Sequence, residues 1–153
     1  MSIPRAVAVV LDAGRVLVIK RYLRLSRAVD CVMCAAGGWR GADCGGHRYA
    51  VLPGGHVEPG ETAEEAALRE LDEETTLSAE VDRLLWTGSH NGRTAHYFLM
   101  TNVQGTATLS GDEATANSPN NSFELIWADV HTLAAHRIYP IEIGARLLAL
   151  VDV

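Results

Sequence analysis

Long hydrophobic runs are missing from this chain of 153 residues. The longest apolar stretches, Ala6 to Leu11 and Leu147 to Val151, fall far short of the roughly 20 residues that cross a bilayer, so we expect no transmembrane helix. The six apolar residues between Arg5 and Asp12 are also too few for the core of a signal peptide. We therefore expect a cytoplasmic protein in a reducing compartment, with no membrane partner.

Basic residues are also few, with 13 Lys and Arg against 19 Asp and Glu and a formal net charge of −6. A protein that binds nucleic acid non-specifically needs the opposite balance, so the composition argues against a nucleic-acid partner. Hydrophobic residues make up 48% and charged residues 21%, which is typical of globular rather than disordered chains. The length predicts a single domain over residues 1–153.

Cysteine is scarce and confined to one region. Cys31, Cys34 and Cys44 lie within fourteen residues, and His47 follows three positions later. An odd, clustered number argues against a disulfide framework, whereas two close ligand pairs are typical of a closed structural zinc site. The alternative interpretation is three unremarkable thiols and a surface histidine. Our hypothesis is a structural Zn²⁺ in an insertion at about residues 22–48, where five glycines interrupt any regular element.

Hydrophobic periodicity predicts strands on both sides of one strong helix. Two Val- and Ile-rich segments, Arg5–Leu11 and Val16–Lys20, flank a turn and predict an opening β-hairpin. Pro53, Gly54 and Gly55 predict a further turn. Later strands are expected at Tyr49–Leu52, Val81–Gly88, Ala95–Val103 and Phe123–Asp129, and helical spacing recurs at Leu133–His136 and Ile141–Leu150. This order predicts a mixed sheet between helices.

The strongest signal predicts a helix from Ala63 to Thr75, because Thr62 and Glu65 form a capping box at its start. Three carboxylates lie on or beside the helix side that alanines and a leucine mark as apolar: Glu70, Glu73 and Glu74. Acids three and four positions apart repel one another unless a cation neutralises them. Oxygen ligands with no thiol or imidazole nearby select Mg²⁺ or Mn²⁺, which points to phosphate chemistry.

Residues 55–77 resemble the Nudix box, whose pattern is G-x5-E-x7-R-E-U-x-E-E-x-G-U with U aliphatic. The fixed positions filled in this chain are Gly55, Glu61, Arg69, Glu70, Leu71, Glu73, Glu74 and Leu77. Thr76 stands where the family usually has glycine. A left-handed helix end costs a β-branched residue about 1–2 kcal/mol relative to glycine, so we expect the loop after the helix to turn differently.

The resemblance implies an α/β fold, namely a Nudix-type α/β/α sandwich with a mixed β-sheet. It also implies Mg²⁺-dependent hydrolysis of a nucleoside diphosphate linked to another moiety, by water attack on phosphorus. The implied metal ligands are Glu70, Glu73 and Glu74 with the Gly54 carbonyl, and Glu70 is the candidate to orient or deprotonate the water. An ion pair between Glu61 and Arg69 is implied to fix the loop to the helix.

Family members often use one more glutamate from a later loop as a ligand or base. Glu113 lies in a polar loop where such a residue commonly sits, and Glu124 lies beside a predicted strand, so both candidates stay open. The expected partners are a small nucleotide or nucleoside diphosphate derivative and a second copy of the chain in a homodimer. The alternative is a catalytically silent nucleotide sensor or a zinc-loop interaction module of the same fold, although the complete carboxylate set favours the enzyme.

Two groups of side chains carry weaker signals. Arg21, Arg24 and Arg27 are interpreted as a solvated surface, with phosphate steering as the alternative. The strand aromatics are interpreted mainly as core residues, with base stacking as the alternative. They are Tyr49, Trp86, Tyr97, Phe123 and Trp127.

Overall fold

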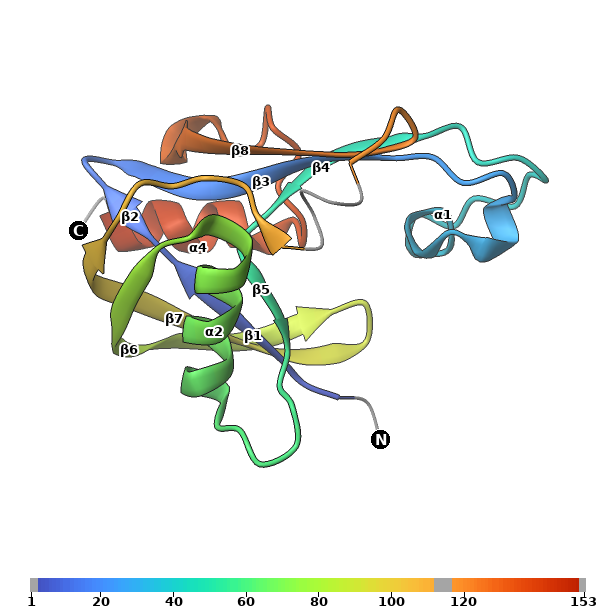
Figure 1. Ribbon diagram of the computed structural model, residues 1–153. Coiled ribbons are helices and arrows are strands. Elements are labelled where there is room, and N and C mark those ends of the chain that lie inside the picture. The colour runs from blue at the N-terminus through green and yellow to red at the C-terminus, as the bar shows by residue number, and fades with distance from the viewer. Residues whose placement is uncertain (1–2, 112–116, 152–153) are drawn as a thin grey trace.

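The computed structural model describes residues 3–111 and 117–151, whose strands form two four-stranded sheets (Figure 1). The strands are β1 (Arg5–Val9), β2 (Leu11–Asp12), β3 (Arg15–Leu23), β4 (His47–Val51), β5 (Gly54–His56), β6 (Ser78–His90), β7 (Arg93–Gln104) and β8 (Asn121–Asp129). The helices are α1 (Val32–Ala36), α2 (Ala63–Thr75) and α4 (Glu142–Val151), with 3-10 turns η1 (Ala28–Asp30) and η2 (Val130–Thr132). Within these described ranges, no helix has the length and apolar character that a membrane span requires.

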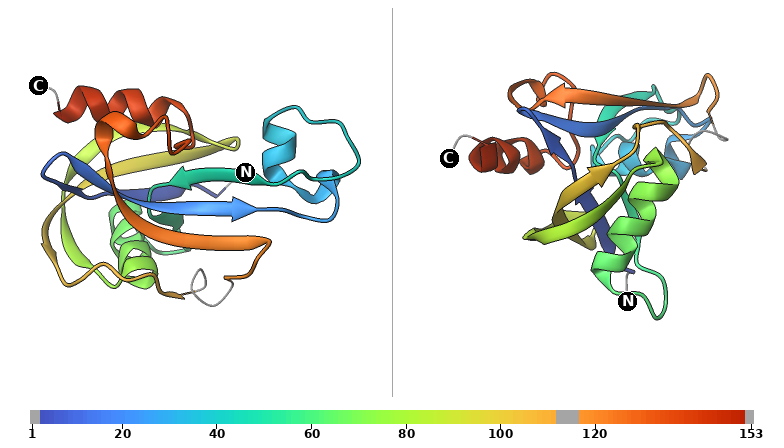
Figure 2. Two further views of the ribbon diagram at one scale, coloured as in Figure 1. Left: turned by 90° about the horizontal axis from the view of Figure 1, so that it is seen from above. Right: turned by 60° about the vertical axis from the view of Figure 1, so that its left-hand side comes forward.

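The first sheet has the order β5-β1-β7-β6 and is mixed, because β1 runs parallel to β7 and antiparallel to β5. The second sheet contains β2, β3, β4 and β8, with β3 between β4 and β8. Helix α2 lies on one side of the sheets and α4 on the other (Figures 1 and 2). The expected mixed α/β architecture is therefore confirmed, with the strands divided between two sheets.

Strand β1 separates two hydrophobic cores, because its side chains alternate between its two faces. Ala6 and Ala8 pack in the core that holds α2, whereas Val7 and Val9 pack in the core that holds α4. Helix α2 contributes Ala66, Ala67 and Leu71 to the first of these cores, each with 0% of its surface exposed. Small alanines on both elements let the two backbones approach closely, which places the acidic end of α2 next to β1 and β5.

The opening hairpin differs from the prediction. The turn is present, but it joins β3 to the two-residue strand β2, with Leu11 paired to Val16. Strand β1 leaves this hairpin and pairs with β5 and β7 in the other sheet. The physical reason is that the side chains of β1 are buried alternately in two cores. A hairpin of β1 with β3 alone does not provide two cores.

Two further predictions of local structure were wrong. Gly54–His56 forms strand β5 rather than a turn, because Ala6 and Gly55 pair across an antiparallel ladder. Leu133–His136 forms turns after η2 rather than a helix, while the helix expected near Ile141–Leu150 is present as α4.

The ends of α2 show how local chemistry sets its length. At the start, Thr62 Oγ1 accepts a hydrogen bond of 3.1 Å from the Glu65 N–H, as the capping box predicts. At the end, Thr76 adopts the left-handed conformation with φ of 63°. Its N–H donates to the Asp72 carbonyl and its Oγ1 donates to the Thr106 carbonyl at 2.9 Å. The chain thus keeps a left-handed helix end without glycine, contrary to the different turn that Thr76 led us to expect.

The connection between β3 and β4 carries η1 and α1 and projects from the body of the molecule (Figures 1 and 2). We call residues 24–46 the lobe. A small core of its own fills it, formed by Ala28, Cys31, Cys34 and Cys44. The lobe extends from the ends of β3 and β4, away from α2.

Candidate active site

Arg69 of α2 ties the glycine-rich loop to the acidic helix. Its Nε donates to Glu61 at 2.7 Å, and its Nη2 donates to the His56 carbonyl at 3.0 Å. Its Nη1 donates to Glu70 at 3.0 Å and to Glu73 at 3.2 Å. The hydrogen bond with Arg69 lowers the pKa of Glu61, and the same contact raises the pKa of Arg69. The predicted Glu61–Arg69 ion pair is therefore confirmed.

Gly55 of β5 leaves the space that the Glu70 carboxylate occupies. A Cβ built at position 55 lies 2.3 Å from Glu70 Oε1 and 2.4 Å from its Cδ, far inside van der Waals contact. Any larger residue at position 55 must displace that carboxylate. Since Arg69 holds Glu70 from the other side, the pair Gly55 and Arg69 fixes where Glu70 lies.

Glu74 is the buried member of the three acids, with 5% of its surface exposed. Its Oε2 accepts a hydrogen bond of 3.3 Å from the Gly54 N–H, so it also touches the glycine-rich loop. The side chain of Glu73, by contrast, is 54% exposed. Of the three acids that the helix wheel places on or beside the apolar side, Glu74 is buried and Glu73 lies at the solvent-exposed edge.

Glu74 lines a cavity of about 110 Å³ between α2 and the two sheets. The lining residues are Arg5, Ile19, Arg21, Val51, Leu52, Gly54, Glu74 and Phe123. Two arginines therefore face one buried carboxylate across a space large enough for a few atoms of ligand. This arrangement suits an anionic group that brings cations of its own.

Arg21 is not the solvated surface residue that we expected. Its guanidinium lies over the rings of Phe123 and Tyr49, at 4.5 Å and 5.6 Å from their centroids, and Nη2 donates to Asn121 at 3.2 Å. The reason is the pairing of Arg21 with both β4 and β8, which brings an aromatic residue to each side of it. Tyr49 and Phe123 are thus neighbours of the cavity cation as well as packing residues.

Arg5 escaped the sequence analysis altogether. Burial lowers its pKa, while the charge of Glu74 acts in the opposite direction. The Nε atoms of Arg5 and Arg21 are both buried without a hydrogen-bond partner among the described residues. A buried guanidinium donor normally has an acceptor, so both arginines that line the cavity keep part of their hydrogen-bonding capacity unused among the described residues. A single arginine at the start of a strand gave no signal of this role.

Glu124, one of the two remaining glutamate candidates, is not among the residues that line this cavity. Glu124 is exposed on β8 opposite Lys20, and the neighbouring Phe123 takes the cavity position, because successive strand residues point to opposite faces. Glu113 lies outside the residues that the structure describes.

The predicted Mg²⁺ ligands all lie where α2 meets β5. Arg69 Nη1 donates one hydrogen bond to Glu70 and another to Glu73, and the Gly54 N–H donates to Glu74. Carboxylate and main-chain carbonyl oxygens are hard donors, so the chemistry of this donor set fits Mg²⁺ or Mn²⁺. Among the residues that the structure describes, the group of metal-type side chains close enough together to hold an ion is a different one, at the base of the lobe.

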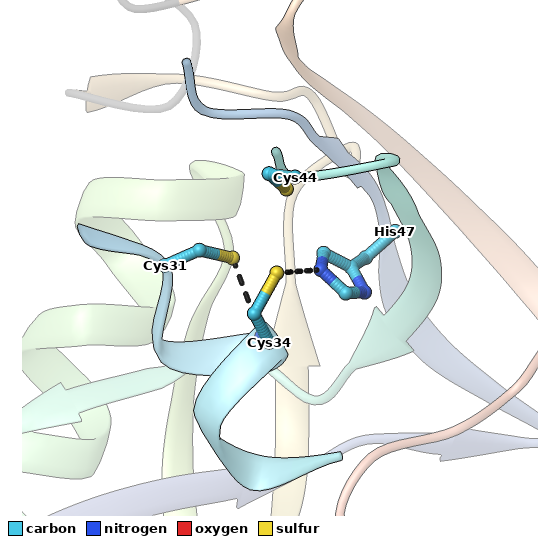
Figure 3. Close-up of side chains that lie close together, drawn as sticks. All are labelled: Cys31, Cys34, Cys44 and His47. Atoms are coloured by element: carbon cyan, nitrogen blue, oxygen red, sulfur yellow. Dashed lines mark hydrogen bonds between the residues drawn. The ribbon is translucent and has the colours of Figure 1, made fainter. Parts of the chain in front are cut away.

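The four predicted zinc ligands come together where the lobe meets β4, three from the lobe and His47 from the start of β4, as Figure 3 shows. The ligand atoms of Cys31, Cys34, Cys44 and His47 all lie within 4.8 Å of one another. The lobe is remote from α2 in the ribbon view (Figure 1), so this group is separate from the acidic helix.

Comparison with known proteins gives one family. The NUDIX domain family model matches residues 1–146. The RNA pyrophosphohydrolase of Erythrobacter litoralis is 32% identical over 97 residues, which cover 51% of this chain and 57% of that protein. The chain thus matches little more than half the length of this relative.

Solved structures are similar over most of the chain. The MutT NUDIX hydrolase from Burkholderia pseudomallei is 25% identical with a TM-score of 0.55, covering 84% of this chain and 83% of that one. A NUDIX hydrolase from Nitrosomonas europaea is 19% identical with a TM-score of 0.61, covering 98% and 90%. The second likeness concerns the fold alone.

Proposed function

The chain belongs to the Nudix family, and from this premise we propose that it hydrolyses the diphosphate bond of a nucleoside diphosphate linked to another moiety. The observation that carries the proposal is the cavity in which buried Glu74 faces Arg5 and Arg21. A diphosphate chain brings several negative charges, and the two guanidinium groups that line the cavity provide matching cations.

In this proposal, Glu70, Glu73 and Glu74 hold Mg²⁺ or Mn²⁺ together with the Gly54 carbonyl. When bound, such a cation neutralises phosphate oxygens and lowers the pKa of a water molecule. The chain itself supplies the positioning. Arg69 fixes Glu70 and Glu73, and the Gly54 N–H fixes Glu74, so that each carboxylate is held before the substrate arrives.

Arg5 and Arg21 bind the phosphate groups. Phe123 and Tyr49 restrict the Arg21 side chain, so little of its rotational freedom remains to be lost on binding. Both guanidinium groups face the charge that develops on the phosphate oxygens as the diphosphate bond breaks. They are the phosphate-binding residues of the proposal.

Glu70 is the proposed base for the attacking water. A bond forms between the water oxygen and one phosphorus atom, while the bond from that phosphorus to the bridging oxygen breaks. The water proton passes to a carboxylate, and the bridging oxygen leaves with the other phosphate. No covalent enzyme intermediate is required, and Glu113 stays a proposed additional ligand or base.

The substrate itself is a small nucleotide derivative in this proposal. Because a relative is an RNA pyrophosphohydrolase, an RNA with a 5′-terminal phosphoanhydride bond belongs among the compounds to be tested. The net charge of −6 favours the small nucleotides over the RNA. We place the activity in a reducing cytoplasm, where three cysteines remain thiols or metal ligands.

The test is turnover over a panel of nucleoside triphosphates, nucleotide sugars, dinucleotides and a 5′-triphosphorylated RNA. We expect Mg²⁺-dependent release of a nucleoside monophosphate or pyrophosphate from at least one of them, and loss of turnover with EDTA. Nucleotide binding without turnover of any compound contradicts the proposal and favours the silent sensor.

A further inference from the structure

A cluster of metal-binding side chains lies where the lobe meets β4, and the proposed hydrolysis does not involve it. Cys31 precedes α1, Cys34 lies within it, Cys44 lies in the following loop, and His47 begins β4. Figure 3 shows the three sulfur atoms and the imidazole turned toward one common point. Residues from the start and from the end of the lobe thus converge on this point.

The distances suit a single tetrahedral ion. With Zn–S of about 2.3 Å and Zn–N of about 2.0 Å, the ligand atoms of a tetrahedral site lie about 3.5–3.8 Å apart. Here Cys34 Sγ and His47 Nε2 are 3.3 Å apart, and the four ligand atoms are mutually within 4.8 Å. Small side-chain adjustments bring them to the required spacing.

The main chain around the cluster orients its sulfur atoms. The Cys34 N–H donates a hydrogen bond of 3.4 Å to Cys31 Sγ, and all three cysteine side chains are buried. Main-chain donors to sulfur are the outer contacts that orient metal-binding thiolates. Three buried sulfur atoms with one imidazole are the donor set of a closed structural zinc site.

The packing of the lobe gives a second, independent reason. Its core consists of four buried residues, and three of them are the cysteines, which are 1–2% exposed. Leu23, Leu25 and Met33 add only partly buried surface. So small an apolar core supplies little folding free energy, whereas metal binding at a site of this kind supplies folding free energy directly.

We propose that Cys31, Cys34, Cys44 and His47 bind one structural Zn²⁺ that holds the lobe folded. All four positions of the tetrahedron are filled by protein ligands, so the site is closed and has no place for a substrate. The site is separate from the acidic helix, so the zinc proposal does not depend on the proposed hydrolysis.

The zinc also fixes one wall of a cavity larger than the one at Glu74. Met33 and His47 line a space of about 630 Å³ together with Tyr139, Leu133 and Leu148. His47, a ligand, and Met33, next to Cys34, therefore connect the metal to this cavity. Loss of the ion is expected to make this wall of the cavity as mobile as the lobe.

The first experiment measures metal in the native chain, purified without added zinc and without chelator. We expect elemental analysis by inductively coupled plasma mass spectrometry to find about one Zn²⁺ per chain. Iron in its place, or no metal together with a disulfide between two of the cysteines, overturns the proposal. Exchange into Co²⁺ provides a second readout. Tetrahedral cobalt absorption with a thiolate charge-transfer band is expected, and an octahedral cobalt spectrum contradicts the site.

The second experiment compares His47→Asn with His131→Asn, whose histidine is exposed on η2. We expect His47→Asn to lose zinc at least about tenfold more readily to a competing chelator, and His131→Asn to behave as the native chain. Amide hydrogen exchange over residues 24–46 should rise when zinc is removed, while α2 stays protected. Unchanged exchange in the lobe after complete removal of the metal rejects the structural role.

Discussion

The Gly55→Ala substitution should displace one carboxylate of the site while changing the stability of the fold only slightly. The new Cβ lies 2.3 Å from Glu70 Oε1, whereas an ordinary contact begins at 3.4 Å, so the carboxylate must move by at least about 1 Å. Glu70 ends a flexible side chain, so the expected cost is an off-rotamer side chain of about 0.5–1.5 kcal/mol. That lowers Tm by no more than about 6 °C for a domain of this size.

The effect on catalysis is expected to be much larger. A reacting group displaced by about 1 Å loses rate by about a hundredfold. The assay is kcat on whichever panel compound the native chain hydrolyses, with Tm measured on the same preparation. Gly88→Ala is the matched control, because a Cβ there meets Trp86 and Tyr97 at an ordinary 3.8 Å.

A double variant tests whether the clash with Glu70 is the cause. In a Glu70→Ala background the obstruction is gone, so adding Gly55→Ala should change neither kcat nor Tm further. The reasoning is refuted if Gly55→Ala keeps native kcat, or if it lowers kcat in the Glu70→Ala background as much as in the native chain.

Three other perturbations test separate contacts. Arg21→Gln removes a cation from the cavity and should lower kcat/KM about 10- to 100-fold, whereas Arg24→Gln, at an exposed position, should leave it unchanged; equal effects on kcat/KM would disprove phosphate binding. Arg69→Lys keeps the charge but loses the planar fork that reaches the loop and two helix acids, so Tm should fall by about 3–6 °C by thermal melting, and an unchanged Tm contradicts this. Burial lowers the pKa of His90 to about 4, so the unfolded state binds more protons between pH of about 6.5 and 4. Stability should therefore fall as pH decreases through that window, with a smaller decline in His90→Gln than in the native chain by urea unfolding; parallel curves would exclude the contribution of His90.

Local signals predicted α2 and its partners well, because they depend on short spacings in one helix. Thr62 caps the helix, Glu74 is buried on the alanine face, and Arg69 pairs with Glu61. The gathering of the four Cys and His residues was also readable from spacing, since two close pairs need only one reversal of the chain between them.

Contacts between distant segments could not be read in this way. The parallel pairing of β1 with β7 joins residues about ninety positions apart, and no local pattern specifies it. The same pairings bring Arg5 and Arg21 to Glu74. Arg21 resembled a solvated residue because the two aromatic neighbours come from β4 and β8, which are remote in sequence.

The most direct test of the central claim compares two acid-to-amide changes on the same turn of α2. Glu74→Gln neutralises the buried carboxylate that faces the cavity, and Asp72→Asn neutralises an exposed one on the opposite side. With Mg²⁺ and the hydrolysed substrate, we expect kcat of Glu74→Gln to fall at least about a hundredfold, and kcat of Asp72→Asn to match the native chain. Native turnover in Glu74→Gln, or an equal loss in both variants, would contradict diphosphate hydrolysis at this site.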